Sequence, residues 1–136
     1  MLSSKHTTAA LTLACALLAS TTTALVVDVQ AGTVTHLNGS GRAVGVDAVT
    51  GVEGFFGTAQ GDRFLAALGS ADATVEIAGG DGDDHFVEGL GSQVLLGDGG
   101  DDTIVVTTRD IGDDERFEGG AGFDTLDLRG VAETRW

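Results

Sequence analysis

The stretch Gly79-Gly80-Asp81-Gly82-Asp83-Asp84-His85-Phe86-Val87 decides the fold that this sequence predicts, because its pattern recurs along the chain. Two later segments align with it without gaps. An earlier, degenerate segment keeps the first Gly, the sixth-position Asp and the eighth-position apolar residue. The segments are Gly97-Asp98-Gly99-Gly100-Asp101-Asp102-Thr103-Ile104-Val105, Gly119-Gly120-Ala121-Gly122-Phe123-Asp124-Thr125-Leu126-Asp127 and Gly57-Thr58-Ala59-Gln60-Gly61-Asp62-Arg63-Phe64-Leu65. They start at positions 57, 79, 97 and 119, so the starts lie 22, 18 and 22 residues apart and mark an internal repeat.

Apolar residues keep the same phase as the repeats. One stands at the eighth position of each repeat, and another stands two places before each first Gly. These eight are Phe55, Phe64, Ile77, Phe86, Leu95, Ile104, Phe117 and Leu126. A nonapeptide is expected to form a six-residue turn and a three-residue strand, whose middle residue points inward. With two nonapeptides per coil, we predict an all-β fold: a short parallel β-roll (a β-solenoid) of about four coils.

The four Gly/Asp turns are whole coils apart, so we expect them to stack along one edge. Asp84, Asp102 and Asp124 would then lie in register, one strand spacing of ~4.8 Å apart. Like charges at that distance repel by roughly a few kcal/mol, which a bound cation relieves. Calcium suits such turns, because it takes 6–8 oxygen ligands, backbone carbonyls included. Magnesium needs a smaller octahedral site, and zinc lacks Cys and His ligands here.

The pattern Gly-Gly-x-Gly-x-Asp-x-apolar-x resembles the RTX (repeats-in-toxin, hemolysin-type) calcium-binding repeat. Residues 79–87 and 119–127 match it fully, and residues 97–105 match with Asp98 in second position. The resemblance is close over residues 46–130 and loose over 25–45. It implies a parallel β-roll with calcium held between successive turns.

Two calcium sites follow from this resemblance. One would use residues 79–84 with 97–102, and the other would use 97–102 with 119–124. The implied metal-binding residues are Gly79, Gly80, Asp81, Gly82, Asp84, Gly97, Asp98, Gly99, Gly100, Asp102, Gly119, Gly120, Gly122 and Asp124. A third pairing, of Asp62 with residues 79–84, is less favoured because Gln60 stands where the pattern has Gly.

Composition excludes several other classes of protein. The formal charge is −14, and residues 46–136 hold 20 of the 21 acidic residues and 18 of the 22 glycines. We therefore expect no nucleic-acid or anionic-membrane partner, since both need clustered Lys and Arg. The single cysteine rules out a disulfide framework. No nucleophile elbow, zinc-protease helix, EF-hand or Rossmann fingerprint is present, so we expect no enzyme activity.

The N-terminus reads as a secretory signal peptide over residues 1–24. Lys5 precedes an apolar run at 8–19, which is too short for a membrane span of ~20 residues. A buried helix, or an arbitrary start within a longer chain, is the alternative. The rest of the chain divides into a lead-in strand and loop segment (25–45), the calcium-binding repeats (46–130) and a C-terminal tail (131–136).

These observations predict a secreted, extracellular calcium-binding module without a membrane span. Its core is thin, so we expect calcium to drive folding, because metal binding adds free energy only in the folded state. The expected partners are calcium ions and a cell-surface or matrix component. Two alternatives stay open: a calcium-dependent adhesion or interaction module, and the C-terminal fragment of a larger secreted enzyme or toxin.

Overall fold

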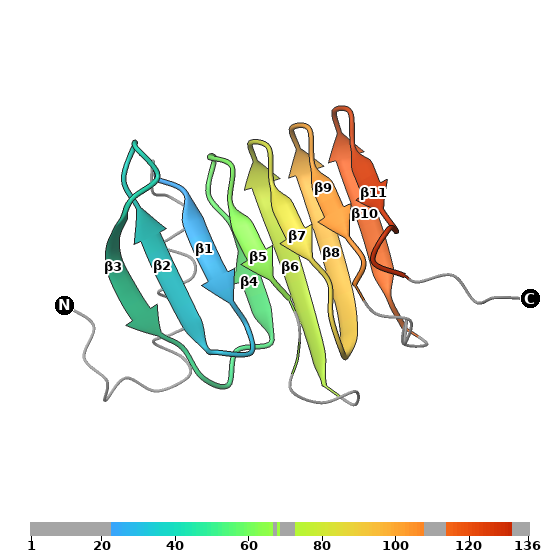
Figure 1. The fold of residues 1–136 in the computed structure, drawn as a ribbon, viewed down its shortest axis with the longest axis horizontal. Helices are drawn as coiled ribbons and strands as arrows, with labels where there is room; N and C mark the ends of the chain where they lie inside the picture. The colour runs from blue at the N-terminus through green and yellow to red at the C-terminus, as the bar shows by residue number, and fades with distance from the viewer. Residues whose placement is uncertain (1–22, 67, 69–72, 108–113, 132–136) are drawn as a thin grey trace, which may run out of the picture.

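The computed structural model describes residues 23–66, 68, 73–107 and 114–131. These residues form strands and no helix, and the strands make two sheets that enclose the core (Figure 1). In chain order the strands are β1 (Leu25–Asp28), β2 (Thr33–Leu37), β3 (Ala43–Ala48), β4 (Gly54–Phe56), β5 (Arg63–Leu65), β6 (Thr74–Asp81), β7 (His85–Val87), β8 (Ser92–Gly99), β9 (Thr103–Val105), β10 (Arg116–Ala121) and β11 (Thr125–Asp127). Within these described ranges, no helix has the length and apolar character needed to cross a membrane.

The predicted fold class, a simple parallel β-roll of about four coils, is wrong. Sheet A has seven strands in the order β11-β9-β7-β5-β1-β2-β3, and it is mixed. Strand β1 pairs antiparallel with β2, and β2 pairs antiparallel with β3, whereas β1, β5, β7, β9 and β11 pair in parallel. Sheet B has four parallel strands in the order β10-β8-β6-β4.

Tight turns explain the antiparallel part. Antiparallel strands can be joined by a short hairpin, whereas parallel neighbours need a long crossover. Asn38 closes the turn between β2 and β3: its Oδ1 accepts hydrogen bonds from the backbone N–H of Ser40 and of Arg42, both at 3.0 Å. Gly41 supplies a positive φ of 76° in the same turn. The lead-in segment is therefore a three-stranded meander at one end of sheet A (Figure 1).

The register predicted for the apolar residues is confirmed. In sheet A, Phe64, Phe86, Ile104 and Leu126 are paired in succession, and Val27 of β1 precedes them. In sheet B, Phe55, Ile77, Leu95 and Phe117 are paired in the same way. The rings of Phe64 and Phe86 stack with their centroids 5.1 Å apart. Two of the eight are not fully buried: Phe117 is half-buried and Leu126 is 51% exposed, because β10 and β11 are the last described strands of their sheets.

The strands of sheet B are longer than predicted. Strand β6 continues through Asp81, β8 through Gly99 and β10 through Ala121, which is the third position of each full repeat. The turn between the sheets is correspondingly tighter. Aspartates at positions five and six of these repeats accept hydrogen bonds from the backbone of the adjacent layer.

Two sequence predictions fall mainly on residues that the structure does not describe. The predicted signal peptide, 1–24, lies outside the described residues except for Thr23 and Ala24. The predicted tail, 131–136, is described only at Val131.

Candidate metal centre

The sixth-position aspartates form a continuous row along the stacked turns, which is buried at Asp62, Asp84 and Asp102 and exposed at Asp124. Each carboxylate accepts a hydrogen bond from a backbone N–H of the preceding layer. Oδ1 of Asp84 accepts from Asp62 N at 2.7 Å, and Oδ1 of Asp102 accepts from Asp84 N at 2.8 Å. Oδ1 of Asp124 accepts from Asp102 N at 3.1 Å, and Oδ1 of Asp62 accepts from Leu25 N of β1 at 2.6 Å. We call Asp62, Asp84, Asp102 and Asp124 the inner row.

The second carboxylate oxygen, Oδ2, has different surroundings in the full repeats and in the degenerate one. Asp84 is 2% exposed and Asp102 is 1% exposed, and Oδ2 of each is buried without a hydrogen-bond partner. In the degenerate repeat, by contrast, Oδ2 of Asp62 accepts from Thr58 N at 2.5 Å. A buried oxygen without a partner is costly, so Asp84 and Asp102 have unfilled capacity for a ligand.

Burial also disfavours the charged form of these carboxyls. Loss of water contact is the largest cause that raises the pKa of Asp84, to about 8, and the neighbouring charges of Asp62 and Asp102 add to it. Desolvation likewise raises the pKa of Asp62 and of Asp102, against the lowering effect of their backbone hydrogen bonds. Binding a proton or a cation therefore favours the burial of Asp62, Asp84 and Asp102.

Glycine at the first position leaves room beside each unpartnered oxygen. A Cβ added at Gly79 would collide with Oδ2 of Asp84 and would lie 3.0 Å from the carbonyl oxygen of Gly97. A Cβ added at Gly97 would collide with Oδ2 of Asp102 and with the carbonyl oxygen of Gly119. In both places, a carboxylate oxygen and a carbonyl oxygen of the next layer converge where only glycine fits.

Gly97→Ala is expected to destabilise the protein by about 1–3 kcal/mol, because the new methyl group meets backbone that cannot move aside. Gly39→Ala is the matched control, since a Cβ there would meet nothing within 4 Å. Urea unfolding in excess calcium, followed by far-UV circular dichroism, measures both variants. Equal midpoints for the two variants would contradict the close packing inferred at Gly97.

The fifth-position aspartates, Asp83 and Asp101, form a second, outer row that is not among the predicted metal ligands. Oδ1 of Asp83 accepts from Asp101 N at 2.9 Å, and Oδ1 of Asp101 accepts from Phe123 N at 2.8 Å. These carboxylates reach toward the following layer, whereas the inner row reaches toward the preceding one. The repeat pattern places no restriction on the fifth position, so it does not predict this row. The sequence feature that could have indicated it is the Asp-Asp pair in residues 79–87 and 97–105.

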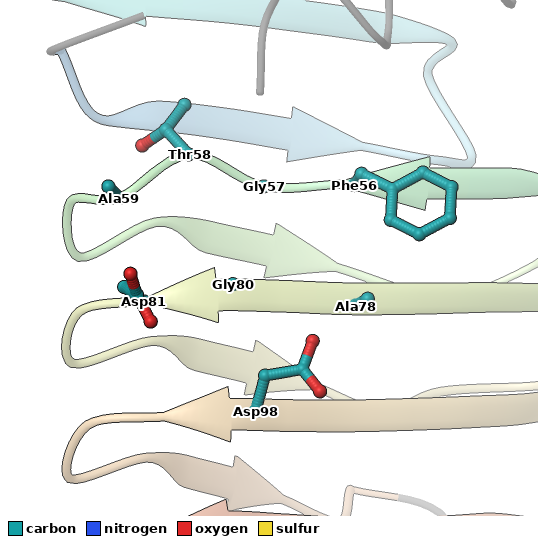
Figure 2. Close-up of a pocket in the computed structure, with 8 residues that line it drawn as sticks. All are labelled: Phe56, Gly57, Thr58, Ala59, Ala78, Gly80, Asp81 and Asp98. Atoms are coloured by element: carbon teal, nitrogen blue, oxygen red, sulfur yellow. The ribbon is translucent and has the colours of Figure 1, made fainter. Parts of the chain in front are cut away.

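Asp81 and Asp98 lie apart from the inner row. Both are exposed, and they border an open hollow of about 380 Å³ on the outer face of sheet B (Figure 2). Phe56 of β4 forms another part of its border, and Ala78 and Gly80 of β6 lie between (Figure 2). The structure therefore brings Asp84, Asp102 and Asp124 together but leaves the carboxylates of Asp81 and Asp98 at the surface.

The other predicted glycines shape the turns. Five of them have a positive φ, between 101° and 142°, which side chains rarely adopt: Gly80, Gly82, Gly100, Gly120 and Gly122. Asp98, in the second position of its repeat, has a φ of 70°. Gly99 pairs with Asp81 on one side and with Ala121 on the other.

Across the described residues, no three His, Cys, Asp or Glu side chains converge where they could hold a metal ion. Side chains are only part of a calcium site, however, because backbone carbonyl oxygens are also ligands. The convergence points at Gly79 and Gly97, like the one at Gly57, combine one carboxylate oxygen with one carbonyl oxygen. They suit a hard, oxygen-preferring cation rather than zinc.

No family model, curated protein or solved structure matches this chain.

Proposed function

We propose that this chain is a secreted calcium-binding module that folds on binding extracellular calcium and has no catalytic role of its own. The observation that carries the proposal is the pair of buried, unpartnered carboxylate oxygens on Asp84 and Asp102. Each stands beside a carbonyl oxygen of the next layer. A divalent cation there would satisfy both oxygens and would neutralise the inner row.

Two sites fit this arrangement. The first would take Oδ2 of Asp84 and the carbonyl of Gly97, and so joins residues 79–84 to 97–102. The second would take Oδ2 of Asp102 and the carbonyl of Gly119, and so joins 97–102 to 119–124. Asp62 is a poorer candidate, because its Oδ2 already accepts a hydrogen bond from Thr58 N.

Calcium is favoured over other ions by the chemistry of the ligands. It accepts carboxylate and carbonyl oxygens in irregular geometry and with 6–8 ligands, so water and further turn carbonyls can complete the shell. Extracellular calcium modules bind with Kd of about 10⁻⁴–10⁻³ M. That range would leave the protein metal-free in a cytoplasm and loaded outside a cell.

Coupling to folding follows from electrostatics. Stacking the turns buries Asp84 and Asp102, and burial opposes the ionisation of both carboxyls. The cation site between the layers exists only in the folded chain, so the free energy of cation binding adds to the stability of the folded state.

The test is a calcium titration of the chelated protein, followed by far-UV circular dichroism at neutral pH. We expect β-sheet signal to grow with calcium and to saturate in the millimolar range or below, whereas magnesium at the same concentration has a smaller effect. A spectrum that is fully β-rich in chelator and does not change with calcium would remove the coupling to folding. A calcium electrode or calorimetry on the same sample would then decide whether calcium binds at all.

A further inference from the structure

The hollow on the outer face of sheet B has an aromatic side and an acidic side (Figure 2). Phe56 of β4 stands on one side, and 62% of its surface is exposed to solvent. The exposed carboxylates of Asp81 and Asp98 stand on the other side. Ala78 and Gly80 of β6 lie between the two sides, and their small size leaves the hollow open.

Strand register fixes how far apart the two sides are. Phe56 pairs with Ala78, and Gly80 pairs with Asp98, so the outer face carries all four along three neighbouring strands. Strands β4 and β8 are two strand spacings apart, which is roughly 10 Å. A long, thin side chain can therefore lie across β6 and contact both Phe56 and Asp98.

Asp98 is held over this hollow by an unusual backbone conformation. Its neighbours in the same row of sheet B are Gly80 and Gly120. Among the described residues, Asp98 is the only one other than glycine with a positive φ, which is 70°. Residues with side chains adopt this region at a cost, and such residues are common where a ligand is held. In Figure 2 the carboxylate of Asp98 points toward β6.

The acidic side of the hollow lacks a basic partner in the described part of the chain. Neither Asp81 nor Asp98 forms a salt bridge there, whereas Glu118 and Asp127 each pair with an arginine two residues away. The formal charge of the whole chain is −14. The hollow is therefore complementary to a cation that also has an apolar or flat surface.

We propose that this hollow binds an arginine side chain presented by a partner polypeptide. The guanidinium would donate hydrogen bonds to the carboxylate of Asp98 and would stack on the ring of Phe56. Its methylene stem would cover Ala78, and Asp81 would add negative potential. Calcium suits the hollow less well, because it takes 6–8 oxygen ligands and the side chains of Phe56 and Ala78 offer none.

The experiment is a titration of the isotope-labelled chain with the peptide acetyl-Gly-Gly-Arg-Gly-Gly-amide, followed by two-dimensional NMR of the backbone amides. It is done in excess calcium, so the chain is folded whether or not folding depends on calcium. We expect saturable shifts at Phe56, Gly80 and Asp98, with Kd in the millimolar range. Replacing the arginine of the peptide by citrulline, its neutral analogue, should weaken binding roughly tenfold or more. Replacing it by lysine should weaken binding severalfold, because an ammonium group lacks the planar fork.

Two variants of the protein test the two sides of the hollow. Asp98→Gly suits the positive φ, and Phe56→Ala removes an exposed ring, so both should stay folded. Each should weaken binding of the arginine peptide severalfold or more. Asp47→Asn removes one charge from β3 of sheet A and should leave the affinity unchanged.

Three results would overturn the proposal. The first is the absence of saturable shifts around the hollow. The second is equal affinity for the arginine and lysine peptides that neither variant changes, which would mean general attraction to the acidic chain. The third is loss of peptide binding as calcium rises with the fold unchanged, which would assign the hollow to metal. None of the three bears on Asp84 and Asp102, so this proposal and the proposed calcium sites can fail separately.

Discussion

Asp84→Asn is expected to weaken calcium binding on the order of 100-fold and to stabilise the chelated protein at the same time. The amide oxygen can still accept the hydrogen bond from Asp62 N, so the layer contact is kept. What is lost is the negative charge at a buried oxygen that has no partner. Removing even an indirect metal contact costs 10–100-fold in affinity, and Asp84 would be a direct ligand.

In chelator the same substitution is expected to raise the stability of the folded state. The reason is that the Asn side chain is neutral and needs neither a proton nor a cation to be buried. At about pH 9, above the Asp84 pKa of about 8, the wild-type carboxyl must be buried as an anion. The variant avoids that cost and should be more stable by up to about 5 kcal/mol. Calcium titration and urea unfolding of both proteins measure the two effects.

Asp47→Asn is the matched control for this pair of measurements. Asp47 is a half-exposed residue of β3, where its carboxylate contacts His36 at 2.8 Å. Its loss should leave calcium affinity unchanged and should change stability little. If Asp84→Asn and Asp47→Asn have equal effects on calcium affinity, the assignment of Asp84 as a ligand is wrong.

The chelated protein is expected to lose stability as pH rises from 4 to 9. The pKa of Asp84 in the folded state is about 8, against 3.8 for an unperturbed carboxyl, so folding favours the protonated form. Its contribution is fully present below about pH 4 and is lost as pH rises through about 8. The pKa values of Asp62 and Asp102 are raised too, and they act in the same direction.

The size of this effect is up to about 5 kcal/mol for Asp84 alone, which is a large part of the 5–15 kcal/mol of a typical domain. Calcium should reverse the trend. Protons and calcium compete for the same oxygens, so affinity should rise with pH until the carboxyls are ionised.

Far-UV circular dichroism in chelator at several pH values measures the trend as a loss of β-sheet signal with rising pH, and Asp84→Asn should make that loss smaller. Chelated protein that becomes more stable between pH 5 and pH 8 would show that the inner row is not the dominant titrating group.

The sequence predicted most of the packing in the repeats. Phe55, Phe64, Ile77 and Phe86 stand at fixed places in their repeats, and side chains alternate strictly across a strand. The alternation sets which residues of a strand point into the core, and the fixed place in the repeat sets which of them meet in neighbouring strands. The same spacing placed Asp84, Asp102 and Asp124 in one row, as their hydrogen bonds confirm.

The sequence predicted a lead-in strand and loop segment at 25–45, but it did not predict how the strands there pair. Residues 25–48 contain no repeat, so nothing in their spacing sets the direction of β2 and β3. Their antiparallel pairing depends on the turn closed by Asn38 and on the free edge of β1, and the second of these exists only once sheet A has formed.

The sequence by itself determined where the acidic and apolar residues recur, and hence which of them lie in register. Only the tertiary structure decided which carboxylate oxygens stay without a partner. Asp62 and Asp84 hold the same place in their repeats, yet Thr58 N reaches Oδ2 of Asp62 and nothing described reaches Oδ2 of Asp84. The second residue of the full repeats, such as Gly80, has a positive φ, and Thr58 does not. The direction of one backbone N–H relative to a buried carboxylate is a three-dimensional property, and spacing along the chain does not contain it.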